Sequence, residues 1–177
     1  MKFDIMPVAT EKQMEEIEKL AHEIWHDCYK DVFSAEQIDY MLNRFHSVKA
    51  LKSQLSEQII YYMLLLNNEL IGYLSFKNQG DHIFLSQLYL KEKYRRQGVG
   101  RRILVMFDNL IGSAEFNSIK KIKLHVNRKS YGALHAFEHM KFKRVNAIDK
   151  EIGSGYFDKV YVMERRFNRN QGVSHGE

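Results

Sequence analysis

Basic residues and glycines are concentrated in the segment Arg95-Arg96-Gln97-Gly98-Val99-Gly100-Arg101, which follows soon after the apolar run Leu88–Leu90. At a turn from strand to helix, unpaired N–H groups and the helix dipole attract anions. Glycines at 98 and 100 let phosphate oxygens approach the backbone, and arginines add charge-assisted hydrogen bonds. The segment therefore predicts a site for a phosphorylated ligand, with a plain turn that binds nothing as the alternative.

Two better-known phosphate loops do not match this segment. The P-loop requires Gly-x-x-x-x-Gly-Lys-Ser/Thr, and the chain contains no such run. The dinucleotide fingerprint requires a third glycine or an alanine where Ile103 stands, and it normally opens a first βαβ unit. The phosphorylated ligand is therefore expected to be of another kind.

A second pattern with chemical potential is His22-Glu23-Ile24-Trp25-His26, which reads as the His-Glu-x-x-His of zinc peptidases. The apolar stripe of this predicted helix centres near Ile17 and Cys28, and at about 100° per residue both histidines point away from it. A metal there would face solvent, without a dry cavity to strengthen its field. We therefore interpret these histidines, and the pair His135 and His139, as solvated side chains and expect no metal.

The glycine segment and a downstream pattern together resemble the GNAT superfamily of acetyl-CoA-dependent N-acetyltransferases. Arg95-x-x-Gly98-x-Gly100 matches that family's Gln/Arg-x-x-Gly-x-Gly/Ala signature. A degraded form of its second motif is Leu124-x-Val126-x-x-x-Ser130-x-x-Ala133-x-x-x-Phe137-x-x-x-Lys141-Phe142. The segments Ile152–Tyr156 and Tyr161–Glu164 look like a bacterial small-molecule branch, so the resemblance covers nearly the whole chain.

The resemblance implies acetyl-CoA as co-substrate. Its pantetheine arm would pair with the backbone of a strand, as an added strand does, and its pyrophosphate would bind the N–H groups of residues 96–101. The implied cofactor-binding residues are Leu88, Tyr89, Leu90, Arg95, Arg96, Gln97, Gly98, Val99, Gly100, Arg101, Ser130 and Phe137. The acceptor amine would attack the thioester directly, and a strand N–H near Leu90 would stabilise the oxyanion.

Departures from the family pattern concern acid–base chemistry. Ser130 stands where asparagine is usual, and Phe137 stands where a tyrosine often protonates the departing thiolate. Because phenylalanine has no proton to give, we expect Ser130 or Tyr131 to substitute, with Tyr156 or water as alternatives. The expected catalytic residues are thus Leu90, Ser130 and Tyr131. The usual carboxylate is absent from the strand at 86–90, so the sequence names no general base.

In the family, the first two helices border the acceptor site. Trp25, Tyr29 and Tyr156 are therefore the expected acceptor-binding residues, although a place in the helix core is the favoured interpretation for Trp25. The branch resemblance favours a small primary amine as the acceptor. Small amines, polyamines, antibiotics and protein N-termini are all compatible with the sequence.

The elements that must position these residues follow from hydrophobic periodicity and turn signals. Capping signatures at Thr10 and Ser34 begin two helices, and a third helical stretch carries Val48, Leu51 and Leu55. The predicted order is β-α-α-β-β-β-α-β-α-β-β, an α/β fold with a GNAT-like twisted mixed sheet flanked by helices. The parallel strands at 82–90 and 121–126 would splay apart to admit the pantetheine arm.

Composition limits the domain organisation and the location. Of the 177 residues, 45% are hydrophobic and 28% are charged, a balance typical of a globular protein with a substantial core. We expect a single N-acetyltransferase domain over residues 1–167 and a disordered tail over 168–177. The longest apolar run is shorter than the roughly 20 residues that a membrane span needs, residues 1–4 carry no apolar leader, and the one cysteine cannot form an internal disulfide. The cytoplasm is therefore the expected location, without a membrane partner.

The net charge of +5 suggests a polyanionic partner, and six basic residues fall within 91–102. A nucleic-acid-binding module is one alternative, but the cluster is compact and no series of exposed aromatic residues accompanies it. No nucleic acid is therefore expected as a partner. A protein that binds acetyl-CoA as a sensor, without catalysis, is the other alternative. The resemblance is compatible with a homodimer but does not predict one.

Overall fold

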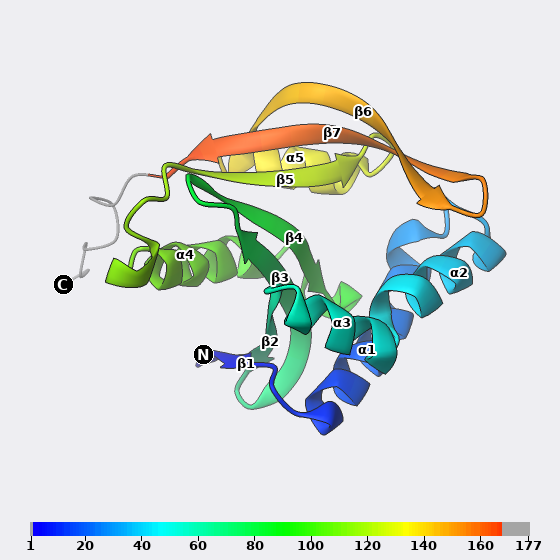
Figure 1. The fold of residues 1–177 in the computed structure, drawn as a ribbon, viewed down its shortest axis with the longest axis horizontal. Coiled ribbons are helices and arrows are strands. Elements are labelled where there is room, and N and C mark those ends of the chain that lie inside the picture. Colours follow the sequence, from blue (N-terminus) through cyan, green and yellow to red (C-terminus); the bar gives the residue numbers. More distant parts are fainter. Residues whose placement is uncertain (1, 168–177) are drawn as a thin grey trace.

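The computed structural model describes residues 2–167, which form one mixed sheet with helices on both faces (Figure 1). The strands are β1 (Phe3–Pro7), β2 (Ile60–Leu66), β3 (Glu69–Asn78), β4 (His82–Leu90), β5 (Lys121–Asn127), β6 (Lys143–Gly153) and β7 (Tyr156–Arg166). The helices are α1 (Glu11–Tyr29), α2 (Ala35–His46), α3 (Val48–Ser56), α4 (Val99–Ile111) and α5 (Tyr131–His139). The tail expected at 168–177 lies outside the described residues.

The predicted α/β fold is confirmed, with two differences in detail. The third helical stretch is a separate helix, α3, so three helices precede β2 where the predicted order has two. Single turns of 3-10 helix at Glu92–Tyr94 and Ala114–Phe116 were not predicted from the sequence. In the described range, no helix is both long enough and apolar enough to cross a membrane.

Local sequence signals explain where the elements begin and turn. Thr10 and Gln13 form the predicted capping box of α1, in which each side chain bonds the other's backbone N–H. At α2, Ser34 accepts from the N–H of Gln37 without the reciprocal bond. Asn67 and Asn68 join β2 to β3 with φ angles of 49° and 66°, the left-handed pair that a two-residue hairpin turn requires.

Two apolar cores lie on the two faces of the sheet. Helices α1, α2 and α3 pack on one face of β2–β4, with Ile17, Leu42 and Tyr73 fully buried among them. Helices α4 and α5 cover the other face, around Phe76 of β3, Phe107 of α4 and buried side chains of β4, β5 and β7. The loop that joins β6 to β7 lies beside α2 (Figure 1), where the Tyr40 hydroxyl donates to the carbonyl of Ile152 at 3.4 Å.

The strand order β1-β2-β3-β4-β5-β7-β6 makes β4 and β5 parallel neighbours joined through α4. They pair only at their first residues, His82–Phe84 with Lys121–Lys123. Beyond Phe84, β4 remains paired with β3 and β5 remains paired with β7, so the two halves of the sheet diverge. The splay expected between these strands is thus present, and it opens toward Leu90 and Asn127.

Candidate active site

The edge of β4 that faces the gap presents backbone groups that no strand binds, although the carbonyl of Leu90 accepts from Arg95 Nε at 2.7 Å. The N–H of Lys91 donates to the carbonyl of Ile71 at 2.9 Å, and Tyr89 lies opposite Tyr73. Because hydrogen-bonding direction alternates along an antiparallel pair, the backbone groups of Leu88 and Leu90 point away from β3 and into the gap. Beyond Phe84, no strand pairs with this edge of β4 among the described residues. This edge can therefore bind an extended chain as a further strand.

The end of β4 passes unusually close to β3 at Gly72. A Cβ placed on Gly72 would lie 2.2 Å from the carbonyl oxygen of Tyr89. Only glycine fits there without moving the strand that carries Leu88 and Leu90.

The segment 95–101 folds into the predicted turn at the start of α4. Gly98 is the N-cap with a φ of 76°, and the first bonded N–H in this helix is that of Arg102, which donates to the Gly98 carbonyl at 3.2 Å. Within the described range, the N–H groups of residues 96–101 have no hydrogen-bond acceptor. They form a cluster of unpaired donors at the positive end of a helix dipole, which is the expected anion site.

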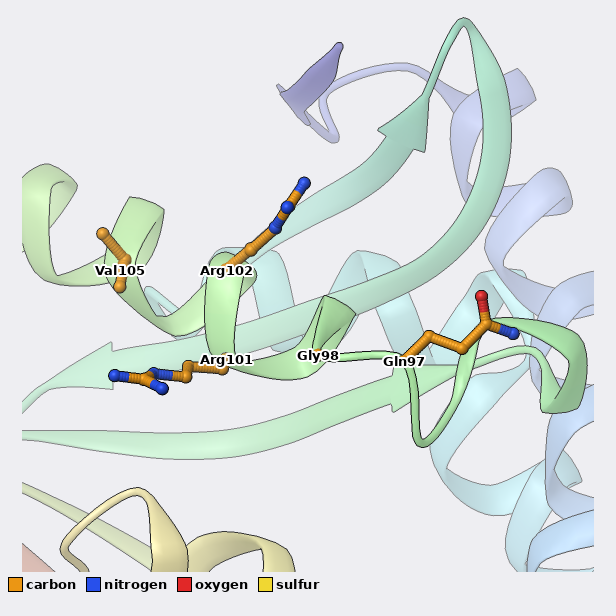
Figure 2. A pocket seen from close by; sticks show the side chains of 5 residues that line it. All are labelled: Gln97, Gly98, Arg101, Arg102 and Val105. Atoms are coloured by element: carbon orange, nitrogen blue, oxygen red, sulfur yellow. The ribbon is translucent and has the colours of Figure 1, made fainter. Parts of the chain in front are cut away.

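A hollow of about 430 Å³ adjoins this turn. Figure 2 shows Gly98 at the bend, with the side chains of Arg101 and Arg102 leaving the first turn of α4 in different directions. A Cβ placed on Gly98 would meet no heavy atom within 4 Å, so the space beside the turn is open to a ligand. The arginine side chains can supply positive charge around it.

Arg95, the first residue of the predicted signature, is engaged inside the fold. Its Nε donates to the carbonyl of Leu90 at 2.7 Å, and its Nη1 pairs with Asp27 of α1 at 2.5 Å. Its Nη2 is buried without a partner among the described residues. The guanidinium therefore fastens the end of β4 to α1, and the backbone N–H of Arg95 donates to the carbonyl of Glu92 at 3.0 Å, so Arg95 positions the site from inside the fold.

On the α1–α2 side of the sheet, polar aromatic side chains form a buried network next to the gap. Trp25 Nε1 donates to the Tyr73 hydroxyl at 3.0 Å, and that hydroxyl lies 3.0 Å from His46 Nε2. The hydroxyls of Tyr29 and Tyr89 share a hydrogen bond of 2.7 Å. Burial lowers the pKa of His46 to about 4, so this ring is neutral at pH 7.

The profile of the acetyltransferase (GNAT) family matches residues 14–142 of the sequence. The chain belongs to the GNAT family. The match spans the helices, the gap and the turn described above, and it ends at Phe142, the last residue of the degraded second motif.

Known proteins similar to this GNAT chain include one from Thermoplasma acidophilum. Its spermidine N(1)-acetyltransferase is 24% identical over 172 residues, which cover 94% of this chain and 99% of that protein. The crystal structure of the PaiA N-acetyltransferase from Thermoplasma acidophilum in complex with coenzyme A has a TM-score of 0.76 at 20% identity, covering 94% of this chain and all of that one. A GCN5-related N-acetyltransferase from Rhodopseudomonas palustris has a TM-score of 0.75 at 14% identity, with 94% and 96% covered. These structures confirm the fold.

The residues expected to bind the acceptor occupy different environments in this GNAT chain. Trp25 is only 5% exposed and supports the rings of Tyr29 and Tyr89, whose centroids lie 5.0 and 5.5 Å away. Tyr29 is half-buried and takes part in the hydroxyl pair at the gap. Tyr156 lies at the start of β7 and packs against Tyr40 of α2 at 5.4 Å. Trp25 is thus a core residue beneath the site, whereas Tyr29 can contact a ligand.

The expected proton donors are less enclosed. Ser130 is the N-cap of α5, and its side chain makes no capping hydrogen bond. Tyr131 follows it with 75% of its surface exposed. Phe137 packs edge-on against Phe142 at 5.5 Å, inside the α4–α5 core, and offers no polar atom.

Sequence reasoning missed three polar residues on the β5–β7 wall of the gap. Asn127 ends β5 and donates to Asp158 of β7 at 2.7 Å. His125 packs against Phe84 at 4.8 Å, and its Nδ1 is buried without a partner among the described residues. Alternation along β7 could have predicted that Asp158 shares a face with Val160, but only the register of β5 with β7 brings it beside Asn127.

The histidines of the His-Glu-x-x-His pattern lie on the surface of α1. His26 Nε2 contacts Asp39 of α2 at 2.9 Å, with the two side chains 43% and 63% exposed, and Glu23 pairs with Lys91 at 3.6 Å. His22, His26 and Asp39 bring ligand atoms within 4.8 Å of one another, a set that could hold an ion at the surface. The glutamate is engaged elsewhere, so the arrangement does not resemble a peptidase centre.

Proposed function

We propose that this GNAT chain transfers the acetyl group of acetyl-CoA directly to a primary amine of a small molecule. The observation that carries the proposal is that two features lie at one end of the sheet: the unpaired N–H groups of residues 96–101 and the edge of β4 with which no described strand pairs beyond Phe84. The first suits a diphosphate and the second suits an extended pantetheine arm. Acetyl-CoA, the acetyl donor of the family, contains both a diphosphate and a pantetheine arm.

The residues of the gap fit this donor. Leu88 and Leu90 direct backbone groups into the gap, and the Leu90 N–H is our proposed donor to the oxyanion of the tetrahedral intermediate. The turn at Gly98 has open space for phosphate oxygens, with Arg101 and Arg102 beside it. Holding both reactants in one gap supplies much of the rate enhancement, because a reaction between two molecules bound side by side is effectively unimolecular.

For the acceptor, we propose a small primary amine of the polyamine class. A spermidine acetyltransferase is among the similar proteins, which supports this choice. Within the chain, the support is the enclosed aromatic pair Tyr29 and Tyr89 at the gap, since aromatic faces attract organic cations. We place the reaction in the cytoplasm, because the one cysteine, Cys28, has no partner for an internal disulfide.

A second candidate is a sensor that binds acetyl-CoA and does not turn it over. The environment of Phe137 favours it, since an apolar ring occupies the place of the family's usual proton donor. A sensor would show acetyl-CoA binding together with a gap that tolerates loss of every polar side chain.

Acetyl-CoA-dependent release of free thiol, measured over a panel of primary amines, tests the proposed function. We expect release that depends on an amine, with diamines and polyamines among the substrates. Tight binding of acetyl-CoA without amine-dependent release of free thiol would overturn the proposed acetyl transfer and favour the sensor.

A further inference from the structure

Asp158 lies on the wall of the gap that β5 and β7 form. It pairs across the strands with Lys150 of β6 and stands two residues before Val160, which pairs with Asn127 at the end of β5. Leu124 and Val126 of β5 point into the α4–α5 core, so Asn127 and its neighbour Asp158 point to the other face. That is the face on which α1 and α2 pack.

The opposite wall carries the hydroxyl pair of Tyr29 and Tyr89. Tyr89 is on β4, and Tyr29 is the last residue of α1. Burial raises the pKa of Tyr29, and the negative charge of Asp158 raises it further, so the carboxylate lies within electrostatic reach of this phenol. A small ligand in the gap can therefore meet Asp158 on one side and the tyrosines on the other.

Asp158 is held in place but forms no direct ion pair among the described residues, although Lys150 lies across the strands from it and its charge acts on the carboxylate. Its Oδ1 accepts from Asn127 Nδ2 at 2.7 Å, and Asn127 is itself fixed by the N–H of Lys129 at 2.8 Å. Its Oδ2 accepts no hydrogen bond among the described residues. By contrast, the half-buried carboxylates of Asp27 and Asp108 each hold an arginine at 2.5 Å. A half-buried carboxylate without a direct ion pair can gain one from a cationic ligand.

We propose that Asp158 binds the ammonium group of the acceptor and takes its proton during acetyl transfer, an inference that rests on the proposed function. Asp158 on β7 would then act as the general base. The end of β4 has no carboxylate for this role, only the amide of Gln87. The bound ammonium first gives one proton to Oδ2, because a protonated nitrogen has no lone pair, and the neutral amine then attacks the thioester carbon. The C–S bond breaks, and the CoA thiolate takes the second proton that the nitrogen loses as the amide forms, directly or through solvent. The first proton passes from Asp158 to solvent.

This assignment names the class of acceptor. A carboxylate facing aromatic rings selects an amine that is cationic at neutral pH, such as an alkylamine or polyamine, over an uncharged arylamine. The other titratable groups on this face include Lys150 on β6, whose positive charge partly offsets the rise in the pKa of Asp158. They also include Lys123 and His125 on β5, Tyr156 on β7, Tyr89 on β4, Tyr29 and Cys28 on α1, and His46 on α2. Burial lowers the pKa of His125, so this ring adds no positive charge at pH 7.

The test compares Asp158→Asn with Asp149→Asn in the full chain. Asp149 is a matched control, because it lies on β6, points to the opposite face and pairs with Arg128 at 2.8 Å. For alkylamines, we expect D158N to lower kcat/KM by about 10²-fold or more, as loss of a general base does. D149N should stay within about twofold of the wild type. Both variants should keep the acetyl-CoA thermal shift, and D158E should recover part of the activity.

The pH profile provides a second readout. Burial raises the pKa of Asp158, so wild-type kcat/KM should fall on acidification above the ordinary carboxyl range near about 3.9, and D158N should lack this acid limb. Wild-type kcat/KM and an unchanged acid limb in D158N would overturn the role of Asp158 while leaving acetyl transfer intact. If the wild type bound acetyl-CoA but acetylated no amine, the proposed function itself would fall, and this inference with it.

Discussion

At the scale of single residues, the site combines groups held neutral with one carboxylate, that of Asp158, that forms no direct ion pair among the described residues. Burial raises the pKa values of Tyr29 and Tyr89 and lowers that of His46. His46 therefore carries no positive charge at pH 7 that would repel an incoming ammonium, and the two phenols stay protonated and uncharged. Asp158 supplies the negative charge that such a ligand needs.

The neutral state of His46 predicts how stability depends on pH. Its pKa is about 4 in the folded chain, well below the ordinary value near 6.5. Between these values the unfolded chain binds a proton that the folded chain does not, so the free energy of unfolding falls as the pH falls from 6.5 toward 4. The loss should approach about 1.4 kcal/mol per pH unit.

Urea denaturation of the wild type and of His46→Gln at pH 7 and pH 5 measures this effect. The variant should lose less stability than the wild type over the interval, whereas His135→Gln, an exposed histidine on α5, should behave as the wild type does. An equal loss in His46→Gln and the wild type would contradict the assignment of a neutral buried ring.

At the scale of elements, the site depends on how β4 is held after it leaves β5. Arg95 fastens its end to α1, and Gly72 lets β3 pass close beside it. The single turn of 3-10 helix at Glu92–Tyr94 then leads the chain into the turn before α4. The open edge of β4 and the start of α4 are thereby fixed relative to each other.

Gly72→Ala tests this arrangement. The added Cβ would meet the Tyr89 carbonyl oxygen at 2.2 Å, so β4 must shift. We expect a loss of about 1–3 kcal/mol in the free energy of unfolding, together with weaker acetyl-CoA binding. Gly132→Ala is the control, because a Cβ there meets nothing within 4 Å in α5 and alanine favours the helix. Denaturation curves that coincide for Gly72→Ala and the wild type would contradict the close approach.

At the scale of the whole molecule, the sequence predicted the bounds and order of the elements better than the contacts between the residues of the site. The bounds of β4 and α4 and the position of the turn at Gly98 follow from periodicity and glycine spacing, which are local signals. The engagement of Arg95 by Asp27 spans 68 residues of sequence, and no local pattern indicates it. Asp158 was missed for the same reason, since it reaches the gap only through the register of β7 with β5.

The central claim is that the turn at the start of α4 binds the diphosphate of acetyl-CoA. Calorimetric titration with acetyl-CoA tests it in the wild type, in Gly98→Val and in Gly80→Val, a control with a similarly positive φ and open surroundings in a different turn. We expect the wild type and Gly80→Val to bind acetyl-CoA far more tightly than adenosine, and Gly98→Val to lose this binding. Equal affinity for acetyl-CoA in Gly98→Val and the wild type, or equal affinity of the wild type for acetyl-CoA and adenosine, would contradict the claim.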